Sequence, residues 1–147
     1  ILYHTRLSIL DISPQSAQPF SYLHYTLVYN GEIYNYAELR LQLQLDGYRF
    51  ETTGDTEVLA AAFDKWGIDC LHQLDGMFAF AIYDGFRQKL WLARDRFGEK
   101  PLYFFARYGA QTKLKYLLFA SEMKALWAAG VPRQVNHKLM VNYLGLG

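Results

Sequence analysis

The segment GMFAFAIYDG, residues 76–85, restricts the possible folds of this chain more than any other feature, because a long apolar run ends abruptly in Asp-Gly. A strand that is apolar on both sides must be covered on both faces of its sheet. The segment LWLARD, residues 90–95, follows after a short loop and has the composition of a returning strand. We therefore expect a β-hairpin whose first strand is buried.

Further strands are predicted on either side of this hairpin. LYFFARYG and LKYLLFA, residues 102–109 and 114–120, predict a second hairpin, in which we expect PLYFF to be a core strand. Alternating apolar and polar side chains predict strands at residues 7–9, 22–29 and 48–53. Consecutive hairpins of this kind favour antiparallel sheets.

Helical patterns separate the strands. Asn35 followed by Glu38 is typical of a capping box and predicts a helix that ends at Gly47. Apolar residues at helical spacing begin after the turn at 54–55 and end at Gly67.

The last part of the chain predicts two short helices, one capped by Ser121 and ending at Gly130, the other within residues 134–147. Strands outnumber helices, and there are too few strand–helix–strand alternations for a doubly wound sheet. We expect an α+β fold with four layers, in which helices lie outside two packed antiparallel sheets.

Composition and charge narrow the possible functions. With 147 residues, 52% of them hydrophobic, the chain can bury a core. A net charge of +1 without runs of like charge argues against binding to nucleic acid or to a membrane surface. No apolar stretch reaches membrane-spanning length, and the first residues, ILYHTR, do not resemble a signal peptide. We expect a cytoplasmic protein with small-molecule or protein partners.

Cys70 is the only cysteine, so neither a disulfide nor a cysteine-rich metal site can form within this chain. Its neighbours are apolar, and we expect it to be packed in the core rather than to act as a nucleophile. The histidines are scattered without paired spacing, so we expect no metal site.

The corner Asn30-Gly31-Glu32 follows a strand-like run and precedes a helix. Glycine lets a backbone approach a ligand closely. An Asn amide and a Gly N–H together offer two donors to one point, as an oxyanion hole requires. The alternative is that Asn-Gly forms an ordinary turn.

Two other residues make that corner chemically coherent. Arg6 could hold a carboxylate with both arms of its guanidinium, or form a salt bridge at a sheet edge. Asp55 could bind an ammonium group, or only cap the helix that follows it. A cation for an α-carboxylate, two anions for an α-ammonium and two donors for a tetrahedral oxygen suit the hydrolysis of an amino acid's side-chain amide.

Six segments can be compared by their order and spacing: HTRLSILD, VYNGEIYNY, TTGDTEV, LDGMFAFAIYD, LARDRFGEKPLYF and FASEMKAL. Together they resemble the class II glutamine amidotransferase domain of glutamine-hydrolysing asparagine synthetases. The resemblance implies the αββα sandwich of the N-terminal-nucleophile (Ntn) hydrolases. It assigns the oxyanion hole to Asn30 and Gly31. It assigns the binding of L-glutamine to Arg6, Leu7, Ser8, Ile9, Leu10, Glu32 and Asp55. We expect Arg94, Asp95 and Gly98 to fix a loop rather than contact substrate.

The sequence departs from that family in one respect. The family's nucleophile is an amino-terminal cysteine that precedes the segment matching Arg6, and no such cysteine is present here. An SGGxDS-like phosphate loop is also missing. We therefore expect an amidotransferase domain truncated at its N-terminus over residues 1–130, a linker and the start of a synthetase domain over residues 131–147, and no glutaminase activity in this chain alone.

In the full-length protein the resemblance implies that ammonia from glutamine passes to a synthetase domain that uses ATP and Mg²⁺ to amidate aspartate. The resemblance is also compatible with a homodimer. Two alternatives stay open. The chain could be a non-catalytic amino-acid-binding or scaffold module of the same fold, or it could serve an amidotransferase with another acceptor.

Overall fold

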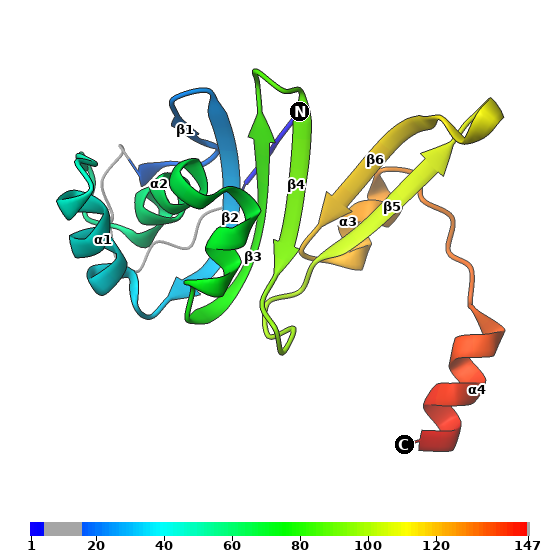
Figure 1. The fold of residues 1–147 in the computed structure, drawn as a ribbon. Helices are drawn as coiled ribbons and strands as arrows, with labels where there is room; N and C mark the ends of the chain where they lie inside the picture. The colour runs from blue at the N-terminus through cyan, green and yellow to red at the C-terminus, as the bar shows by residue number, and fades with distance from the viewer. Residues whose placement is uncertain (5–15, 147) are drawn as a thin grey trace. The chain divides into compact units, whose positions relative to one another are not determined.

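The computed structural model describes residues 1–4 and 16–146. They form two compact units, Ile1–Pro101 and Leu102–Gly147, which are described separately (Figure 1). The strand expected at residues 7–9 lies outside the described residues.

The first unit contains a four-stranded antiparallel sheet in the order β1-β2-β3-β4. Its strands are β1 (Phe20–Tyr22), β2 (Tyr25–Ile33), β3 (Gly76–Asp84) and β4 (Lys89–Arg94). The strands β3 and β4 form the hairpin predicted from the apolar run, so this prediction is confirmed.

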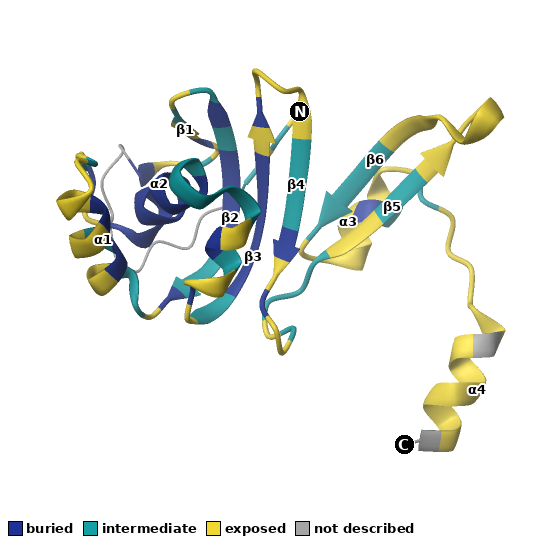
Figure 2. Ribbon diagram, viewed as in Figure 1, coloured by how far each residue is buried: buried dark blue, intermediate teal, exposed yellow. Residues whose placement is uncertain are grey.

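Two helices cover one face of this sheet. α2 (Asp55–Trp66) packs against β1 and β2, and α1 (Tyr36–Leu45) packs against α2. The C-cap of α2, Gly67, has a φ of 59°, and a short 3-10 helix, η2 (Gly67–His72), follows. Figure 2 shows that α2, β2 and β3 are mostly buried, whereas the outer side of α1 is exposed.

Both faces of β3 are buried, as its apolar sequence predicts. Phe80 and Ile82 belong to the hydrophobic core together with the side chains of α2. Ala79 and Ala81 point to the opposite face, because side chains alternate along a strand, and they are 6% and 1% exposed. The apolar run is therefore explained by a central strand covered on both sides.

The second unit contains the antiparallel hairpin of β5 (Tyr103–Tyr108) and β6 (Leu114–Ala120), joined through a 3-10 turn, η3 (Ala110–Thr112). The helix α3 (Met123–Ala128) packs on these strands, and α4 (His137–Leu146) follows. The predicted hairpin and both short helices are confirmed. The expectation that PLYFF is a core strand is wrong, because no residue of β5 is buried and Phe104 is 66% exposed.

Two strand predictions in the first unit are also wrong. Residues 22–29 are not one strand, because Leu23 and His24 form a tight turn between β1 and β2, with Leu23 at a φ of 52°. Residues 48–53 form no strand. Tyr48 and Phe50 alternate like strand residues, yet they pack on the core from an irregular segment.

Two predicted helix caps are wrong as well. Asn35 is the N-cap of α1 but makes no capping bond with its side chain. Its amide instead donates to the carbonyl of Gln73 (2.8 Å) and accepts from the N–H of Asp75 (3.0 Å). The N-cap of α3 is Glu122 rather than Ser121. The local sequence predicts that the side chain of Asn35 caps α1, but in the structure this side chain is hydrogen-bonded to residues distant in the sequence.

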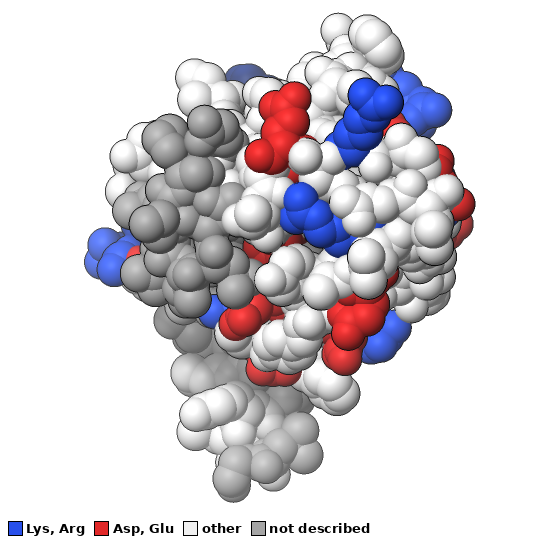
Figure 3. Space-filling model, turned by 90° about the vertical axis from the view of Figure 1, so that its left-hand side faces the viewer, with Lys and Arg blue, Asp and Glu red and all other residues white. Residues whose placement is uncertain are grey.

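Charges of both signs are interspersed on the side of the molecule where α1 lies, as Figure 3 shows. Within residues 1–4 and 16–146, no helix is long and apolar enough to cross a membrane. The same residues contain no cluster of His, Cys, Asp or Glu that could hold a metal ion.

Candidate functional site

Asn30, Gly31 and Glu32 lie inside β2, where they pair with residues of β3. The alternative that Asn-Gly forms a turn is therefore wrong. Asn30 is exposed and Glu32 is half-buried. Because side chains alternate along a strand, both project from the sheet face opposite α2.

Among residues 1–4 and 16–146, no strand pairs with one edge of β2 beside these residues, which is called the open edge below. The pairing with β1 extends along β2 only as far as Leu27. Beyond that point, side chains take the place of a neighbouring strand. The N–H of Tyr29 donates to Gln18 Oε1 (2.6 Å), and the N–H of Ile33 donates to Asp55 Oδ2 (3.1 Å). Gly31 lies midway between these residues, so its N–H points to the same edge.

Gly31 has a backbone conformation that other residues rarely adopt. Its φ is +155°, and a Cβ at this position would overlap the carbonyl oxygen of Met77 and lie 2.7 Å from Cα of Phe78. The absence of a side chain therefore allows β2 and β3 to pair closely while the N–H of Gly31 faces the open edge.

Asp55 is brought to this edge by the start of α2. It is the first residue of the helix and only 6% exposed. Its Oδ2 accepts hydrogen bonds from the hydroxyl of Tyr29 (2.6 Å) and the N–H of Ile33. The alternative that Asp55 only caps α2 is wrong, because the N-cap is Gly54. The carboxylate is instead bound to β2 on both sides of Gly31.

The hydroxyl of Tyr29 is a permanent donor to this carboxylate. Burial, and then the negative charge of Asp55, raise the pKa of the Tyr29 phenol far above its ordinary value. The phenol is therefore protonated at physiological pH.

Glu57 is a second buried carboxylate at the start of α2, and sequence reasoning did not identify its role. It is 4% exposed and accepts hydrogen bonds from the N–H of Glu51 (3.0 Å) and from both the N–H and the hydroxyl of Thr52 (2.7 Å each). These bonds hold the segment that leads into Asp55. The only signal in the sequence was an acidic residue soon after Asp55 in TTGDTEV.

Asn30, Gly31 and Glu32 are thus consecutive residues of β2, and Asp55 is bound to the same strand at Tyr29 and Ile33. The other predicted site residues, Arg6, Leu7, Ser8, Ile9 and Leu10, lie outside the described residues. A sequence profile of the glutamine amidotransferase domain matches residues 1–147. This chain belongs to the glutamine amidotransferase family.

Known relatives agree with this assignment. The amidotransferase domain is 40% identical over 149 residues to asparagine synthetase (glutamine-hydrolyzing) 3 of Bacillus subtilis (strain 168), which covers 98% of this chain and 23% of the relative. It is 40% identical over 141 residues to asparagine synthetase (glutamine-hydrolyzing) 1 of the same organism, covering 95% of this chain and 21% of the relative. The chain spans less than a quarter of the length of these relatives.

A solved structure supports the fold of the amidotransferase domain. It is glutamine phosphoribosylpyrophosphate amidotransferase from B. subtilis in complex with ADP and GMP, with a TM-score of 0.68 and 28% sequence identity. The match covers 86% of this chain and 28% of that one. The domain is α+β with antiparallel sheets, a partial Ntn-hydrolase sandwich, as the sequence predicts.

Cys70 is packed in the core of the amidotransferase domain, as expected. It is fully buried in η2. Burial, and then the charge of Asp69, raise the pKa of its thiol to about 12. A thiol that is neutral and inaccessible at physiological pH is a poor nucleophile.

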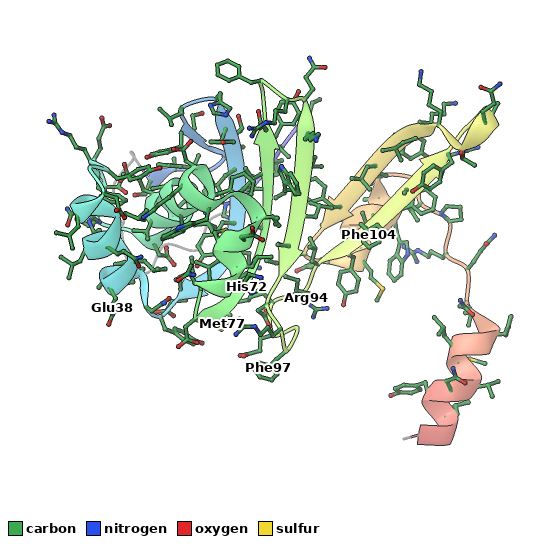
Figure 4. All side chains as sticks on the ribbon, viewed as in Figure 1. Glu38, His72, Met77, Arg94, Phe97 and Phe104 are labelled. Atoms are coloured by element: carbon green, nitrogen blue, oxygen red, sulfur yellow. The ribbon has the colours of Figure 1, made fainter. Side chains whose placement is uncertain are left out.

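The segment ARDRFG of the amidotransferase domain fixes a loop, as predicted. The carboxylate of Asp95 accepts from the N–H groups of Phe97, Glu99 and Lys100, and Arg94 donates to the carbonyls of Gly98 and Lys100. Burial raises the pKa of Asp95, but hydrogen bonds from backbone N–H groups, those of Lys100 and Glu99 first, outweigh burial and lower it to about 2. Figure 4 shows Arg94 and Phe97 at this loop.

Proposed function

We propose that this domain binds L-glutamine at the open edge of β2 and forms part of a glutaminase site. The observation that carries the proposal is the carboxylate of Asp55, which is bonded to β2 at Tyr29 and Ile33, on both sides of Gly31. The carboxylate of Asp55 is thereby fixed to β2 two residues from Gly31.

Each polar group at this edge suits one part of glutamine. Asp55 and Glu32 supply negative charge for the α-ammonium group, and Arg6 supplies the positive charge for the α-carboxylate, with residues 7–10 lining the pocket. This orientation directs the side-chain amide of glutamine toward Asn30 and Gly31.

The amide of Asn30 and the N–H of Gly31 would stabilise the oxyanion. When a nucleophile attacks the amide carbon, negative charge develops on the carbonyl oxygen. Donors that are fixed before the reaction stabilise this charge without reorganising, and one such donor accounts for about 10²–10³ in kcat.

The nucleophile in this proposal is a thiol from outside these 147 residues, because the only cysteine in the sequence, Cys70, is buried. The sulfur of that external thiol bonds to the amide carbon of glutamine. The C–N bond then breaks, and the nitrogen leaves as ammonia with the proton of the thiol. Water then cleaves the thioester, which yields glutamate and restores the thiol.

We further propose that this domain works within a longer cytoplasmic protein, which forms a homodimer and whose second domain uses the ammonia. The names and lengths of the two B. subtilis asparagine synthetases support a synthetase domain that amidates aspartate. We assign ATP and Mg²⁺ to that second domain, and to no residue of this one. We expect no glutaminase activity from residues 1–147 alone.

Glutamate release from glutamine by the complete protein tests the proposal. We expect Asn30→Ala to lower kcat by about 10²-fold or more. Asp55→Asn and Arg6→Ala should raise KM about tenfold or more, because each removes a charged partner of the substrate. Asp69→Asn removes an equal charge from an exposed site in η2 and should change neither constant.

The proposal is wrong if the complete protein, with its thiol nucleophile intact, releases no glutamate. Binding of glutamine without hydrolysis would instead favour the non-catalytic amino-acid-binding module.

A further inference from the structure

Tyr29 has a buried hydroxyl whose partner comes from a distant part of the chain. The side chain projects from β2 into the core and is 4% exposed. Its hydroxyl lies 2.6 Å from Oδ2 of Asp55, which follows 26 residues later. Burying a hydroxyl and a carboxylate is costly unless they are hydrogen-bonded to suitable partners. The hydrogen bond between Tyr29 and Asp55 is therefore a specific contact between β2 and α2.

This contact determines where the carboxylate of Asp55 points. The hydroxyl of Tyr29 and the N–H of Ile33 both donate to Oδ2, from opposite sides of Gly31. Two donors on one oxygen restrain rotation of the carboxylate about its Cβ–Cγ bond. If the hydroxyl of Tyr29 were removed, only one of these two donors, the N–H of Ile33, would remain.

We propose that Tyr29 is a positioning residue, which orients the carboxylate of Asp55 toward the substrate's ammonium group without contacting the substrate itself. The inference rests on the proposed function and adds to it. Affinity for glutamine then depends on a residue that the substrate does not touch.

Tyr29→Phe in the complete protein is the direct test, because it keeps the ring and removes only the hydroxyl. We expect KM for glutamine to rise about tenfold, since a hydrogen bond to a charged group is lost. We expect kcat to change by less than twofold, because Asn30 and Gly31 keep their positions. Tyr25→Phe is the matched control, because Tyr25 is a buried tyrosine on the same face of β2 and lies outside the site.

A double-mutant cycle with Asp55→Asn separates positioning from general stability. If Tyr29 acts through Asp55, Tyr29→Phe should change KM by less than twofold once Asp55→Asn is present. An equal rise in KM in both backgrounds would overturn the inference, as would a single variant indistinguishable from Tyr25→Phe. If Tyr29→Phe does not fold, Tyr29→Met also lacks the hydroxyl and can enter the same cycle.

The outcomes also distinguish this inference from the proposed function. A wild-type protein that releases no glutamate overturns both. An active wild type in which Asp55→Asn raises KM but Tyr29→Phe does not overturns only the role of Tyr29.

Discussion

Gly31 combines two requirements that no residue with a side chain can meet. The strand pairing brings the backbone of β3 against its Cα, and its φ of +155° is a conformation that residues with a side chain rarely adopt. In the proposed site, the neighbouring residues Asn30 and Glu32 supply side chains, while Gly31 supplies only backbone. The proposed chemistry would therefore depend on close packing between β2 and β3.

Substitution of Gly31 by alanine should destabilise the fold strongly. The added Cβ would collide with the backbone of Met77 and Phe78. We expect the free energy of unfolding to fall by about 2–4 kcal/mol, from backbone strain and overpacking together. Urea unfolding measures this change.

Gly109→Ala is the matched control for that substitution. Gly109 has a φ of −93°, and a Cβ there would have its nearest contact at 3.8 Å. It should change stability by less than about 0.5 kcal/mol. Equal losses in the two variants would contradict the steric explanation.

At the scale of elements, the start of α2 is held in place by side chains rather than by a cap. Asp55 joins the helix to β2, and Glu57 joins it to the preceding segment through Glu51 and Thr52. The helix therefore carries Asp55 to the edge of β2 in a defined position, although its N-cap is a glycine without a side chain.

Glu57→Gln tests this arrangement. The carboxylate accepts from two N–H groups and a hydroxyl, whereas the amide places an NH₂ group against the N–H of Glu51 or against the two donors of Thr52. We expect a loss of about 1–3 kcal/mol in the free energy of unfolding. In the complete protein we also expect a higher KM for glutamine, because Asp55 is no longer held firmly.

Glu38→Gln makes the same chemical change on the exposed side of α1, where Figure 4 labels it. It should leave both stability and KM unchanged. If Glu57→Gln changed neither stability nor KM, the segment before α2 would be held by other contacts.

At the scale of the whole molecule, carboxylates in the β3–β4 region couple folding to pH. Backbone N–H of Arg87 is the largest of the interactions that lower the pKa of Asp84, and backbone N–H groups lower that of Asp95 to about 2. Both groups have a lower pKa in the folded chain than in the unfolded chain. Their contribution to stability is therefore complete above the unfolded value, about pH 4, and is lost as the pH falls toward about 2.

Acid unfolding measures this coupling. We expect the urea midpoint to fall steeply between about pH 4 and pH 2, and Asp95→Asn to flatten that slope by removing one titrating group. Asp69→Asn, an exposed site, should leave the slope as it is. A slope that Asp95→Asn does not alter would contradict the role given to this carboxylate.

The sequence by itself determined the elements whose signal lies within a few consecutive residues. Periodicity, which is set by local backbone geometry, predicts the apolar strand β3, the hairpins β3–β4 and β5–β6, and the helices α1 and α2. The chemistry proposed for Asn30, Gly31, Glu32 and Asp55 also starts from the sequence, because it depends on residue type. Resemblance to a family placed these residues in one site.

Only the tertiary structure decided how these residues are held. Tyr29 and Asp55 meet because α2 packs on β2, and Asn35 turns away from its helix because residues 73–75 lie beside it. The segment 48–53 has strand-like alternation, but Glu57 takes the N–H groups of Glu51 and Thr52 that a neighbouring strand would otherwise bind. A hydrogen bond between distant residues depends on the packing of whole elements, and no local pattern encodes it.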